Sequence, residues 1–590
     1  MYILGISEID NDAGAVLLKD AQVVCAANEE RFSRVKQHAG FPHRAIEWVL
    51  QYSGLTLEQI DAIAVTKADP AVNPEVFYRV RDLLLKYDYF SKDDPASFGT
   101  KCLNLLIHKF RNAPRSISTA RKMSREIFDW AVKNGVEEKW VRIPHHYAHA
   151  ACAYWASGYD RALAVSIDGQ GEGVTSQIYL VEAGEFKLLK ETRVPDSLGV
   201  FYAAVTKALG FIPARHEGKV TGLAAYAKPD PVLLSEIRKL AFNTPEGSFR
   251  APSVYGSYPK IQRLVKKYGR EQMAACFQQV LEEVAVEYIA FYVKKHKAEN
   301  VVFAGGVAAN VKLNQRIRHI PGVRKIFIFP HMADGGLGYG AAQILYRAKS
   351  GDRKPAPIRD VYWGPEYPDD AIEAVLKKYG VVYARSQEIE SEIAEILTRD
   401  KVVAHFHGRM EFGPRALGNR SILYPATNPK VNDWLNQQLK RSEFMPFAPV
   451  TLAEHASKCY VDLEGAEFAA RFMTVTADCT EEMKRRSPAV VHVDGTARPQ
   501  LITEELNPRY YRILLEYYKR TGIPSLVNTS FNMHEEPIVS SPEDAVRSFL
   551  QGNLDYLAIG SFLVSKTASF PHDVRRESAS LAILDKSIRG

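Results

Sequence analysis

The segment ALAVSIDGQGEGVTSQIYLVEAGEFKLLKE, residues 162–191, decides the fold of this chain. Its apolar and β-branched residues stand on either side of the polar turn DGQGEG, which predicts two or three hairpin strands. A similar order of strand, polar turn and strand opens the chain, in YILGISE, GAVLLKD and AQVVCAANEE within residues 2–30. Because helical stretches follow each opening, the pattern predicts a duplicated lobe with a cleft between the two copies.

Two later segments fit this layout. NVVFAGGVAANVKLNQRI (300–317) is typical of a buried strand, a glycine turn and a helix start, where backbone amides can meet phosphate or adenosine. KIFIFPHMADGGLGYGAAQILY (325–346) repeats the form with an aspartate in the turn. The fold class we expect is therefore α/β, with the two-lobed layout of actin-like and sugar-kinase-like proteins, in which nucleotides lie between the lobes.

A break in composition divides the chain. AKSGDRKPAPIRDVYWGPEYP is rich in proline, glycine and charge, and we interpret residues 351–367 as a linker. Beyond it, KVVAHFHG and IPSLVNTSFN predict strands, while DDAIEAVLKKYG, NPRYYRILLEYYKRTG and PEDAVRSFLQG predict helices. We therefore expect one domain over residues 1–350 and a second α/β domain over residues 368–575.

Length and composition limit the class of protein. With 590 residues, 46% of them hydrophobic, the chain is long enough for more than one core. No window approaches the roughly 18 continuous apolar residues of a spanning helix, and no basic stretch precedes the first apolar one, so we expect a cytoplasmic protein. The six cysteines form no Cys-x-x-Cys pair, which argues against a disulfide framework and a zinc-thiolate site.

The net charge of +7 is modest for this length and does not require a nucleic-acid partner. One stretch is strongly basic, because residues 101–125 hold only cationic charged residues: Lys101, Lys109, Arg111, Arg115, Arg121, Lys122 and Arg125. This patch is either a solvated helical face or a place where an anionic acceptor or carrier is held near the site.

Histidines cluster in IPHHYAHAACAYWASG, residues 143–158. Alanines after Pro144 favour a helix, on which His145 and His149 lie on one face and could bind one metal ion, whereas His146 points elsewhere. Asp168 and Asp334 stand at strand-to-turn junctions; either alone is more often a turn former. Together the four residues offer a nitrogen and oxygen set that suits iron, zinc or manganese.

Six motifs in order resemble the NodU/CmcH family of O-carbamoyltransferases: EERFSRVKQHAGFP, HHYAHA, SIDGQGEG, HEGKVTGLAAYA, EFGPRALGNRSIL and VNTSFN. The resemblance runs from about residue 1 to 565. It implies an actin-like (ASKHA) N-terminal domain related to the tRNA threonylcarbamoyl transferase, followed by a YrdC-like C-terminal domain. It also implies two stages: carbamoyl phosphate and ATP give carbamoyl adenylate, and a hydroxyl of a sugar or natural product then accepts the carbamoyl group.

The resemblance also implies the site residues. The metal, Fe(II) or else zinc or manganese, falls on His145, His149, Asp168 and Asp334. The adenylate of the N-terminal domain falls on Glu217, Lys219, Gly305, Gly306, Asn310 and Asn314. Carbamoyl phosphate and ATP with Mg²⁺ in the second domain fall on Arg415, Arg420, Lys440, Arg441, Arg498, Asn528 and Ser530. Arginine suits that role because its planar fork binds phosphate oxygens in pairs and keeps its proton.

The chain departs from the family pattern at two places. Asn11 and Asp12 stand where many members have a His-Asp pair whose histidine is a natural base for the acceptor hydroxyl, and asparagine cannot accept a proton near neutral pH. Either Asp12 takes that role, or Asn11 only orients the acceptor, or the acceptor differs. Met445 stands where arginine is common.

Two other functions fit parts of the sequence. A tRNA-modifying enzyme that makes a threonylcarbamoyl adenylate is disfavoured by the joined domains and the GPRALGNRS loop. A carbamoyl phosphate or nucleotide sensor without transfer activity stays open because of Asn11. We expect acceptor specificity within residues 70–135, no nucleic-acid partner and no membrane span, and a homodimer is the assembly we consider.

Overall fold

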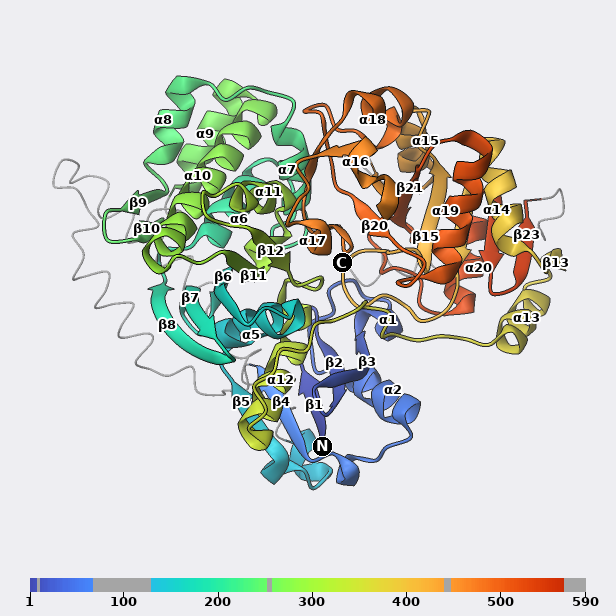
Figure 1. Ribbon diagram of the computed structural model, residues 1–590, viewed down its shortest axis with the longest axis horizontal. Coiled ribbons are helices and arrows are strands. Elements are labelled where there is room, and N and C mark those ends of the chain that lie inside the picture. Colours follow the sequence, from blue (N-terminus) through green and yellow to red (C-terminus); the bar gives the residue numbers. More distant parts are fainter. Residues whose placement is uncertain (8–10, 67–128, 252–256, 440–446, 567–590) are drawn as a thin grey trace.

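The computed structural model describes residues 1–7, 11–66, 129–251, 257–439 and 447–566. The basic patch at 101–125 and most of the segment 70–135 therefore lie outside the described residues, as do Lys440, Arg441 and Met445. Figure 1 shows three bodies: a first lobe that carries the N-terminus, a second lobe with the long helix α10, and a third body formed by the C-terminal part of the chain.

The two lobes contain sheets of the same topology. The first sheet has the order β3-β2-β1-β4-β5 and the second the order β8-β7-β6-β11-β12. In each sheet the first three strands in chain order (β1, β2 and β3, or β6, β7 and β8) pair antiparallel. The other two (β4 and β5, or β11 and β12) run parallel to β1 or to β6. The strands are β1 Tyr2–Ile6, β2 Gly14–Lys19, β3 Gln22–Asn28, β4 Ala62–Thr66, β5 Trp140–Ile143, β6 Arg161–Gly171, β7 Val174–Glu182, β8 Glu185–Arg193, β11 Asn300–Ala304 and β12 Lys325–Ile328. This repeat confirms the duplicated, actin-like layout.

Each lobe sends one helix across to the other. Helix α5 (His145–Ser157) follows β5 of the first sheet but packs on β6 and β11 of the second, and α12 (Leu337–Ser350) follows β12 but packs on β1 and β4 of the first. The two helices also pack against each other. One apolar cluster consequently runs through both lobes, from Ile3 through Tyr154 to Phe327.

Small residues allow this crossing. A Cβ atom on Gly340 of α12 would lie 2.1 Å from the carbonyl oxygen of Ala148 in α5, and one on Gly5 of β1 would lie 2.0 Å from the carbonyl oxygen of Gly338. The alanines of α5 are fully buried, with Ala148, Ala150 and Ala151 at 0% exposure. Backbones therefore pack closer here than any larger side chain permits.

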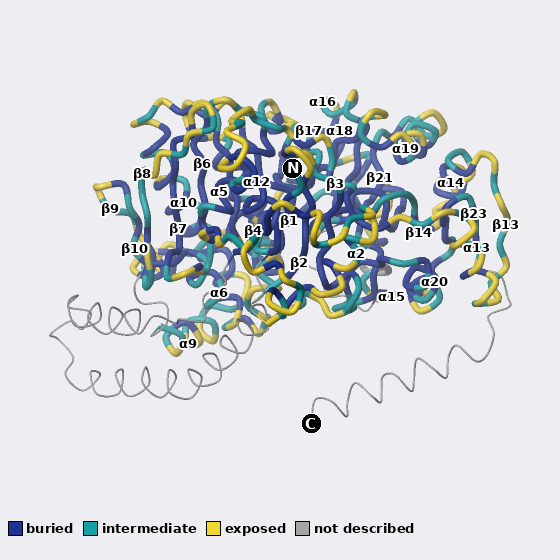
Figure 2. The backbone as a smooth tube through the Cα atoms, turned by 90° about the horizontal axis from the view of Figure 1, so that it is seen from below, coloured by how far each residue is buried: buried dark blue, intermediate teal, exposed yellow. Residues whose placement is uncertain are grey.

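Helices cover the outer faces of the lobes, and Figure 2 shows their exposed sides around buried strands. In the first lobe the outer helix is α2 His43–Ser53, while the short helix α1 Glu30–Ser33 lies at the contact with the C-terminal body. In the second lobe the outer helices are α6 Leu198–Ala208, α7 Glu217–Ala224, α8 Pro231–Arg238, α9 Tyr258–Tyr268, α10 Arg270–His296 and α11 Val311–Arg318, with a small hairpin, β9 Phe242–Thr244 and β10 Ser248–Arg250.

The C-terminal body is built on an eight-stranded mixed sheet of order β13-β23-β22-β14-β15-β21-β16-β20. Successive residues of β14 point to opposite faces, so that Val403 packs under α14 and α19 while Ala404 joins the core under α13 and α20. The strands are β13 Tyr383–Arg385, β14 Val403–Phe406, β15 Arg420–Pro425, β16 Ala448–Leu452, β20 Gln500–Ile502, β21 Ser525–Ser530, β22 Tyr556–Ile559 and β23 Phe562–Ser565.

The helices of this body are α13 Asp369–Lys378, α14 Ile389–Thr398, α15 Val431–Gln438, α16 Ala456–Cys459, α17 Glu467–Ala470, α18 Glu481–Arg486, α19 Pro508–Thr521 and α20 Pro542–Gln551. A three-stranded sheet accompanies them, with β17 Tyr460–Val461, β18 Ala477–Cys479 and β19 Thr496–Ala497. This body is the α/β C-terminal domain that the resemblance describes as YrdC-like, and the predicted fold class is confirmed.

The predicted strands and helices named above from the sequence are present at the expected places. The described part of the chain contains no helix with the length and apolar character needed to cross a bilayer. The five cysteines in the described residues are free thiols and buried.

The helix crossing can be tested at Gly340. Gly340→Ala should lower the free energy of unfolding by about 1–3 kcal/mol or more, because its Cβ would overlap a backbone oxygen that cannot move alone. The control is Gly218→Ala in α7, where nothing lies within 4 Å of the added Cβ and where alanine favours helix. Urea unfolding followed by circular dichroism measures both. Equal stability of the two variants would contradict the close crossing.

Candidate active site

Four possible metal ligands meet where the lobes join. His145 and His149 project from the first turns of α5, and Asp334 stands in the turn Asp334–Gly336 between β12 and α12. Asp168 lies in β6 where its pairing with β7 becomes irregular after Ile167. One ligand atom from each of the four side chains lies within 4.8 Å of all the others. The four residues predicted for the metal are thus brought together.

The distances suit a single ion. His149 Nε2 lies 3.2 Å from Asp168 Oδ2 and 3.5 Å from Asp334 Oδ1, and His145 Nε2 lies 3.8 and 3.9 Å from the same two atoms. Ligands about 2.0–2.1 Å from a tetrahedral metal are about 3.4 Å apart. His149 is fully buried, and among the described residues neither of its ring nitrogens makes a hydrogen bond. The donor set therefore fits a divalent ion of the iron, manganese or zinc type.

The backbone holds the ligands in place. Asp168 accepts hydrogen bonds from the amides of Gly169 (2.5 Å) and Gly306 (2.8 Å). Burial alone would raise the pKa of Asp168, but the two imidazoles beside it hold that pKa well below its ordinary value. Gly171 is required for a different reason: a Cβ there would lie 2.3 Å from the ring of His145.

His146 has a structural place, as the sequence predicts. Its Nδ1 lies 2.7 Å from Ser166 Oγ and its Nε2 lies 2.9 Å from the carbonyl oxygen of Val174. Burial lowers its pKa to about 3, so the ring is neutral. Both of its nitrogens are occupied, and it cannot be a fifth ligand in this arrangement.

Asp12 lies beside the metal cluster in a fixed network. Asn28 Nδ2 donates to the backbone oxygen and to Oδ1 of Asp12, both at 3.2 Å. The amide oxygen of Asn28 therefore faces His331 Nε2, 3.1 Å away, and this nitrogen carries the ring hydrogen. The same nitrogen is 3.6 Å from Asp12 Oδ2. Asp12 also has a left-handed backbone, with φ at 58°.

The basicity of Asp12 differs from that of an ordinary aspartate. Burial raises its pKa well above the usual value, and the nearby carboxylates of Glu30 and Asp334 raise it further. A raised pKa makes the carboxylate a better proton acceptor than the exposed reference group. No contact of Asn11 is recorded in the described part of the structure that would give it a comparable role.

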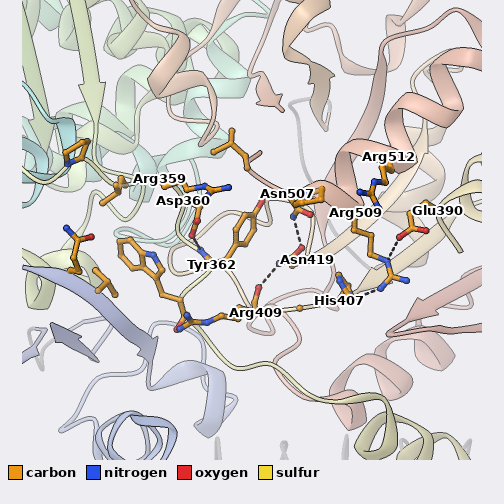
Figure 3. Close-up of a pocket in the computed structure, with 18 of the residues that line it drawn as sticks. Arg359, Asp360, Tyr362, Glu390, His407, Arg409, Asn419, Asn507, Arg509 and Arg512 are labelled. Atoms are coloured by element: carbon orange, nitrogen blue, oxygen red, sulfur yellow. Dashed lines mark hydrogen bonds and ion pairs between the residues drawn. The ribbon is translucent and has the colours of Figure 1, made fainter. Parts of the chain in front are cut away.

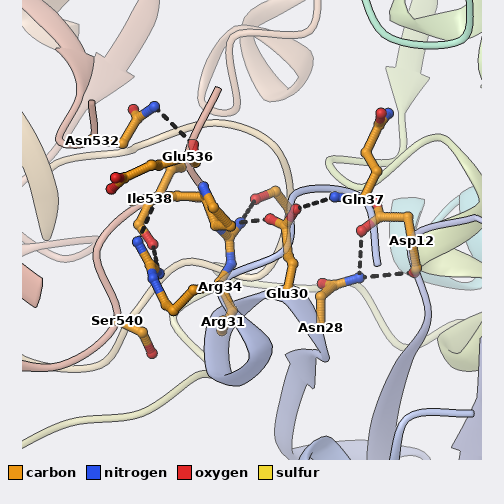
Figure 4. Close-up of polar contacts among 12 residues, drawn as sticks. Asp12, Asn28, Glu30, Arg31, Arg34, Gln37, Asn532, Glu536, Ile538 and Ser540 are labelled. Carbon is orange, nitrogen blue, oxygen red and sulfur yellow. Dashed lines mark hydrogen bonds and ion pairs between the residues drawn. The ribbon is translucent and has the colours of Figure 1, made fainter. Parts of the chain in front are cut away.

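The short helix α1 joins the first lobe to the C-terminal body, as Figure 4 shows. Arg31 Nη2 donates to the carbonyl oxygen of Gly413 at 2.8 Å, and its Nη1 lies 2.9 Å from Glu30 Oε1. Arg34 donates to the carbonyl oxygens of Ile538 (2.8 Å) and Pro537 (2.7 Å). The motif EERFSR therefore connects the first lobe to the C-terminal body through hydrogen bonds.

The loop 411–420 lies against the turn that carries Asp334. Phe412 meets the ring of His331 edge-on, with centroids 4.9 Å apart, and a Cβ on Gly413 would be 3.4 Å from the carbonyl oxygen of Pro330. Inside the loop, the buried carboxylate of Glu411 accepts from the amides of Leu417 (2.7 Å) and Asn419 (2.8 Å). Glu411 thus sets the shape of the loop.

The phosphate role predicted for Arg420 stays a prediction, and the structure gives its side chain a role within the loop. Its side chain is fully buried over the ring of Phe406, and its terminal nitrogens donate to four carbonyl oxygens, those of Pro365, His407, Gly408 and Asn419. Burial lowers its pKa to about 10, which leaves it charged at neutral pH. Arg420 holds the loop together through its two terminal nitrogens, which are engaged by backbone oxygens in this arrangement.

Of the other residues predicted for the second domain, the structure describes Arg415, Arg498, Asn528 and Ser530. Asn528 is buried in β21 and donates to the carbonyl oxygen of Ala416 (3.2 Å) and to Gln500 Oε1 (2.6 Å). Arg415 precedes Ala416, and Arg498 lies two residues before Gln500, which itself donates to the carbonyl oxygen of Leu417 at 2.7 Å. Ser530 pairs with Ser421 in the sheet.

The residues predicted for the adenylate in the N-terminal domain divide into two groups. Asn310 caps α11 by accepting from the amide of Leu313, and Asn314 donates to the carbonyl oxygens of Ala308 and Thr474. The side-chain amides of Asn310 and Asn314 thus also support the fold, and their assignment to the base stays a prediction. The glycines 305 and 306 lie beside Asp168, while Glu217 and Lys219 lie in α7.

Three residues at this site escaped prediction from sequence: Asn28, His331 and Glu411. Glu411 belongs to the quoted loop motif, so its position was a usable signal. Asn28 and His331 come from different lobes and resemble ordinary strand-end residues. Only the fold brings them to Asp12.

The sequence of this chain is similar to that of known proteins over most of its length. Residues 2–343 match the family model described as Carbamoyltransferase N-terminus, and residues 394–566 match Carbamoyltransferase C-terminus. Nodulation protein NolNO of Sinorhizobium fredii is 33% identical over 97% of this chain and 81% of its own. Nodulation protein U of the same organism is 34% identical over 90% and 94%. The uncharacterized protein sll1178 of Synechocystis is 32% identical over 96% and 97%.

Metal binding can be tested at His149. His149→Ala should weaken the binding of Fe(II) or Zn²⁺ by more than about 100-fold, because even residues that only support a metal ligand are worth about 10–100-fold. Equilibrium dialysis with elemental analysis measures the bound metal. His146→Gln is the matched control on the same helix and should keep wild-type affinity. Undiminished binding in a folded His149→Ala protein would place the metal elsewhere.

Proposed function

This chain belongs to the carbamoyltransferase family, as its motifs predicted, and on that premise we propose that it is an O-carbamoyltransferase with two coupled sites. In the C-terminal domain water releases inorganic phosphate from carbamoyl phosphate, and the carbamate so formed attacks the α-phosphorus of ATP to give carbamoyl adenylate and pyrophosphate. In the N-terminal domain the carbamoyl group passes to a hydroxyl of a sugar or natural product, the hydroxyl proton goes to a base, and AMP leaves. The contact between the loop 411–420 and the turn that carries Asp334 is the observation that carries this proposal.

Adenylate formation brings several negative charges together. The proposal assigns Arg415 and Arg498 to phosphate oxygens, with Lys440 and Arg441 completing the set, and Asn528 and Ser530 to the positioning of carbamoyl phosphate. Glu411 and Arg420 contribute by fixing the loop that presents Arg415. ATP is expected to enter with Mg²⁺, and Arg415 would stabilise the charge that develops when pyrophosphate leaves.

Transfer is assigned to the cluster between the lobes. A divalent metal held by His145, His149, Asp168 and Asp334 would supply Lewis acidity to the carbamoyl carbonyl. Asp12, whose pKa is raised by burial, is proposed to accept the proton of the acceptor hydroxyl. Asn28 holds the carboxylate of Asp12 through a hydrogen bond, and His331 Nε2 lies close to the second carboxylate oxygen.

The closeness of the two sites favours direct passage of the intermediate. Carbamoyl adenylate is hydrolysed by water, so a short enclosed route between the sites would preserve it. Arg31 donates a hydrogen bond to the carbonyl oxygen of Gly413 in the loop 411–420. The carboxylate of Glu30, the residue before Arg31, raises the pKa of Asp12. These contacts hold the loop 411–420 against the first lobe, which supports the proposal that the intermediate passes directly from one site to the other.

The phosphate loop has a direct test. Arg415→Ala should lower carbamoyl-phosphate-dependent exchange of pyrophosphate into ATP by about 100-fold or more, because a charged hydrogen bond is worth roughly 1.5–3 kcal/mol and more where charge develops. Arg415→Lys should recover little, since lysine keeps the charge without the fork. Exchange at the wild-type rate in Arg415→Ala would leave Arg415 a structural residue only.

The base has a separate test. Asp12→Asn should abolish carbamoyl transfer to a hydroxylated acceptor without slowing pyrophosphate exchange, because the change removes the proton acceptor from one site and leaves the other intact. Asn11→His should be tolerated or should raise the transfer rate. Mass spectrometry of a panel of hydroxylated metabolites, with ATP and carbamoyl phosphate present, detects the carbamoyl mass gain. Near-normal transfer by Asp12→Asn would assign the base to another group.

A further inference from the structure

A polar cavity lies beside the loop 411–420, lined by the first lobe, the linker and the C-terminal body (Figure 3). Its volume is about 880 Å³, within the range of small-molecule sites. Three separate parts of the chain line it: the start of β3 at residues 21–23, the linker at 356–363, and the C-terminal body around residues 386–390, 407–409 and 506–512. Among the described residues, none of those assigned to adenylate formation or to carbamoyl transfer lines this cavity.

One end of the cavity is made of hydrogen-bond donors. Arg509 Nη1 lies 2.5 Å from His407 Nδ1, and because arginine cannot accept, this nitrogen of the histidine must be the acceptor. Burial, with the charge of Arg509, lowers the pKa of His407 to about 2, so the ring is neutral and its hydrogen sits on Nε2. Arg509 and His407 together therefore present N–H groups, which suits an anion.

Positive charge dominates the lining. Four arginines line the cavity, Arg359, Arg409, Arg509 and Arg512, against two carboxylates, Asp360 and Glu390. The carboxylate of Glu390 lies 3.4 Å from Arg509 Nε. Among the described residues, the Nη groups of Arg509 make one hydrogen bond, which goes to His407. Arg512 is exposed and pairs loosely with Glu504 at 3.5 Å. Both Arg509 and Arg512 belong to the first turns of α19, where the helix dipole also favours an anion.

The cavity has a second, flatter part beside the linker. Tyr362 and Trp363 line it, and Tyr362 donates to the carbonyl oxygen of Leu417 at 2.8 Å, which is the reverse side of the loop 411–420. Arg409 donates to the carbonyl oxygens of Trp363 and of Val24 in the first lobe. An occupant of this cavity would thus touch the linker, the first lobe and the C-terminal body at once.

From these features we propose that the cavity is a second ligand site for a phosphate-bearing metabolite of nucleotide size. The phosphate binds at the donor end, to Arg509, His407 Nε2–H and Arg512, and the remainder of the molecule lies along Tyr362 toward Arg359. The site is separate from the one that holds Arg415, and it would exist whether or not the chain transfers a carbamoyl group.

Binding of defined probes to the full-length protein tests the site. The probes are uridine 5′-monophosphate, glucose 6-phosphate and inorganic phosphate, with uridine as the phosphate-free control, and isothermal titration calorimetry without ATP or carbamoyl phosphate is the measurement. We expect at least one phosphate-bearing probe to bind and uridine to bind far more weakly. Arg509→Gln should weaken that binding by about tenfold or more, since a charged hydrogen bond is lost.

Matched variants separate this site from the proposed active site. Arg520 lies on the same helix outside the cavity and pairs with Glu516. The variant Arg520→Gln should therefore bind the phosphate-bearing probe like the wild type. Arg415→Ala should also keep the binding, and Arg512→Gln should weaken it if Arg509→Gln fails to fold. The proposal is overturned if no phosphate-bearing probe binds, if uridine binds equally well, if Arg509→Gln and Arg512→Gln bind like the wild type, or if Arg415→Ala abolishes binding. Pyrophosphate exchange, measured separately, reports on the proposed function alone.

Discussion

The crossing of α5 and α12 is the contact on which the rest of the site depends. Each helix leaves one sheet and packs on the other, and the two backbones meet where Gly340 faces Ala148. The crossing fixes the first turns of α5, which carry His145 and His149, beside the turn that enters α12, which carries Asp334. Asp168 then completes the cluster from β6. A metal-type ligand set is therefore a direct result of how the two lobes exchange helices.

The same region also receives the C-terminal body. Phe412 and Gly413 pack on Pro330 and His331, so the loop that presents Arg415 and the turn that presents Asp334 touch each other. Arg31 and Arg34 reinforce that contact with hydrogen bonds to backbone carbonyls of the other domain. Because these are bonds from buried or half-buried guanidinium groups to fixed oxygens, they position one domain on the other more firmly than exposed ion pairs would.

The arginines of the chain serve two physically different purposes. Arg420 is buried, stacks on Phe406 and donates to four carbonyl oxygens, so its charge supports a loop. Arg509 lies at the surface of a cavity and keeps donors directed at a space large enough for a ligand. The residue type is the same, and only the number of protein oxygens around each guanidinium distinguishes the structural role from a binding role.

The sequence by itself indicated the order of strands and helices and the duplication of the lobe, because hydrophobic periodicity is a local property, and its resemblance to a known family pointed to four candidate metal ligands. His145 and His149 could be paired from their spacing on a helix. The sequence could not distinguish the role of Arg415 from that of Arg420, which stand five residues apart in one motif. It also could not reveal that the side-chain amides of Asn310 and Asn314 form hydrogen bonds within the fold. It also could not place His331 and Asn28 beside Asp12, or His407 beside Arg509. Those relations join residues from about 15 to more than 300 positions apart, and only the packing of lobes and domains decides which donors meet an acceptor and which remain directed at a cavity.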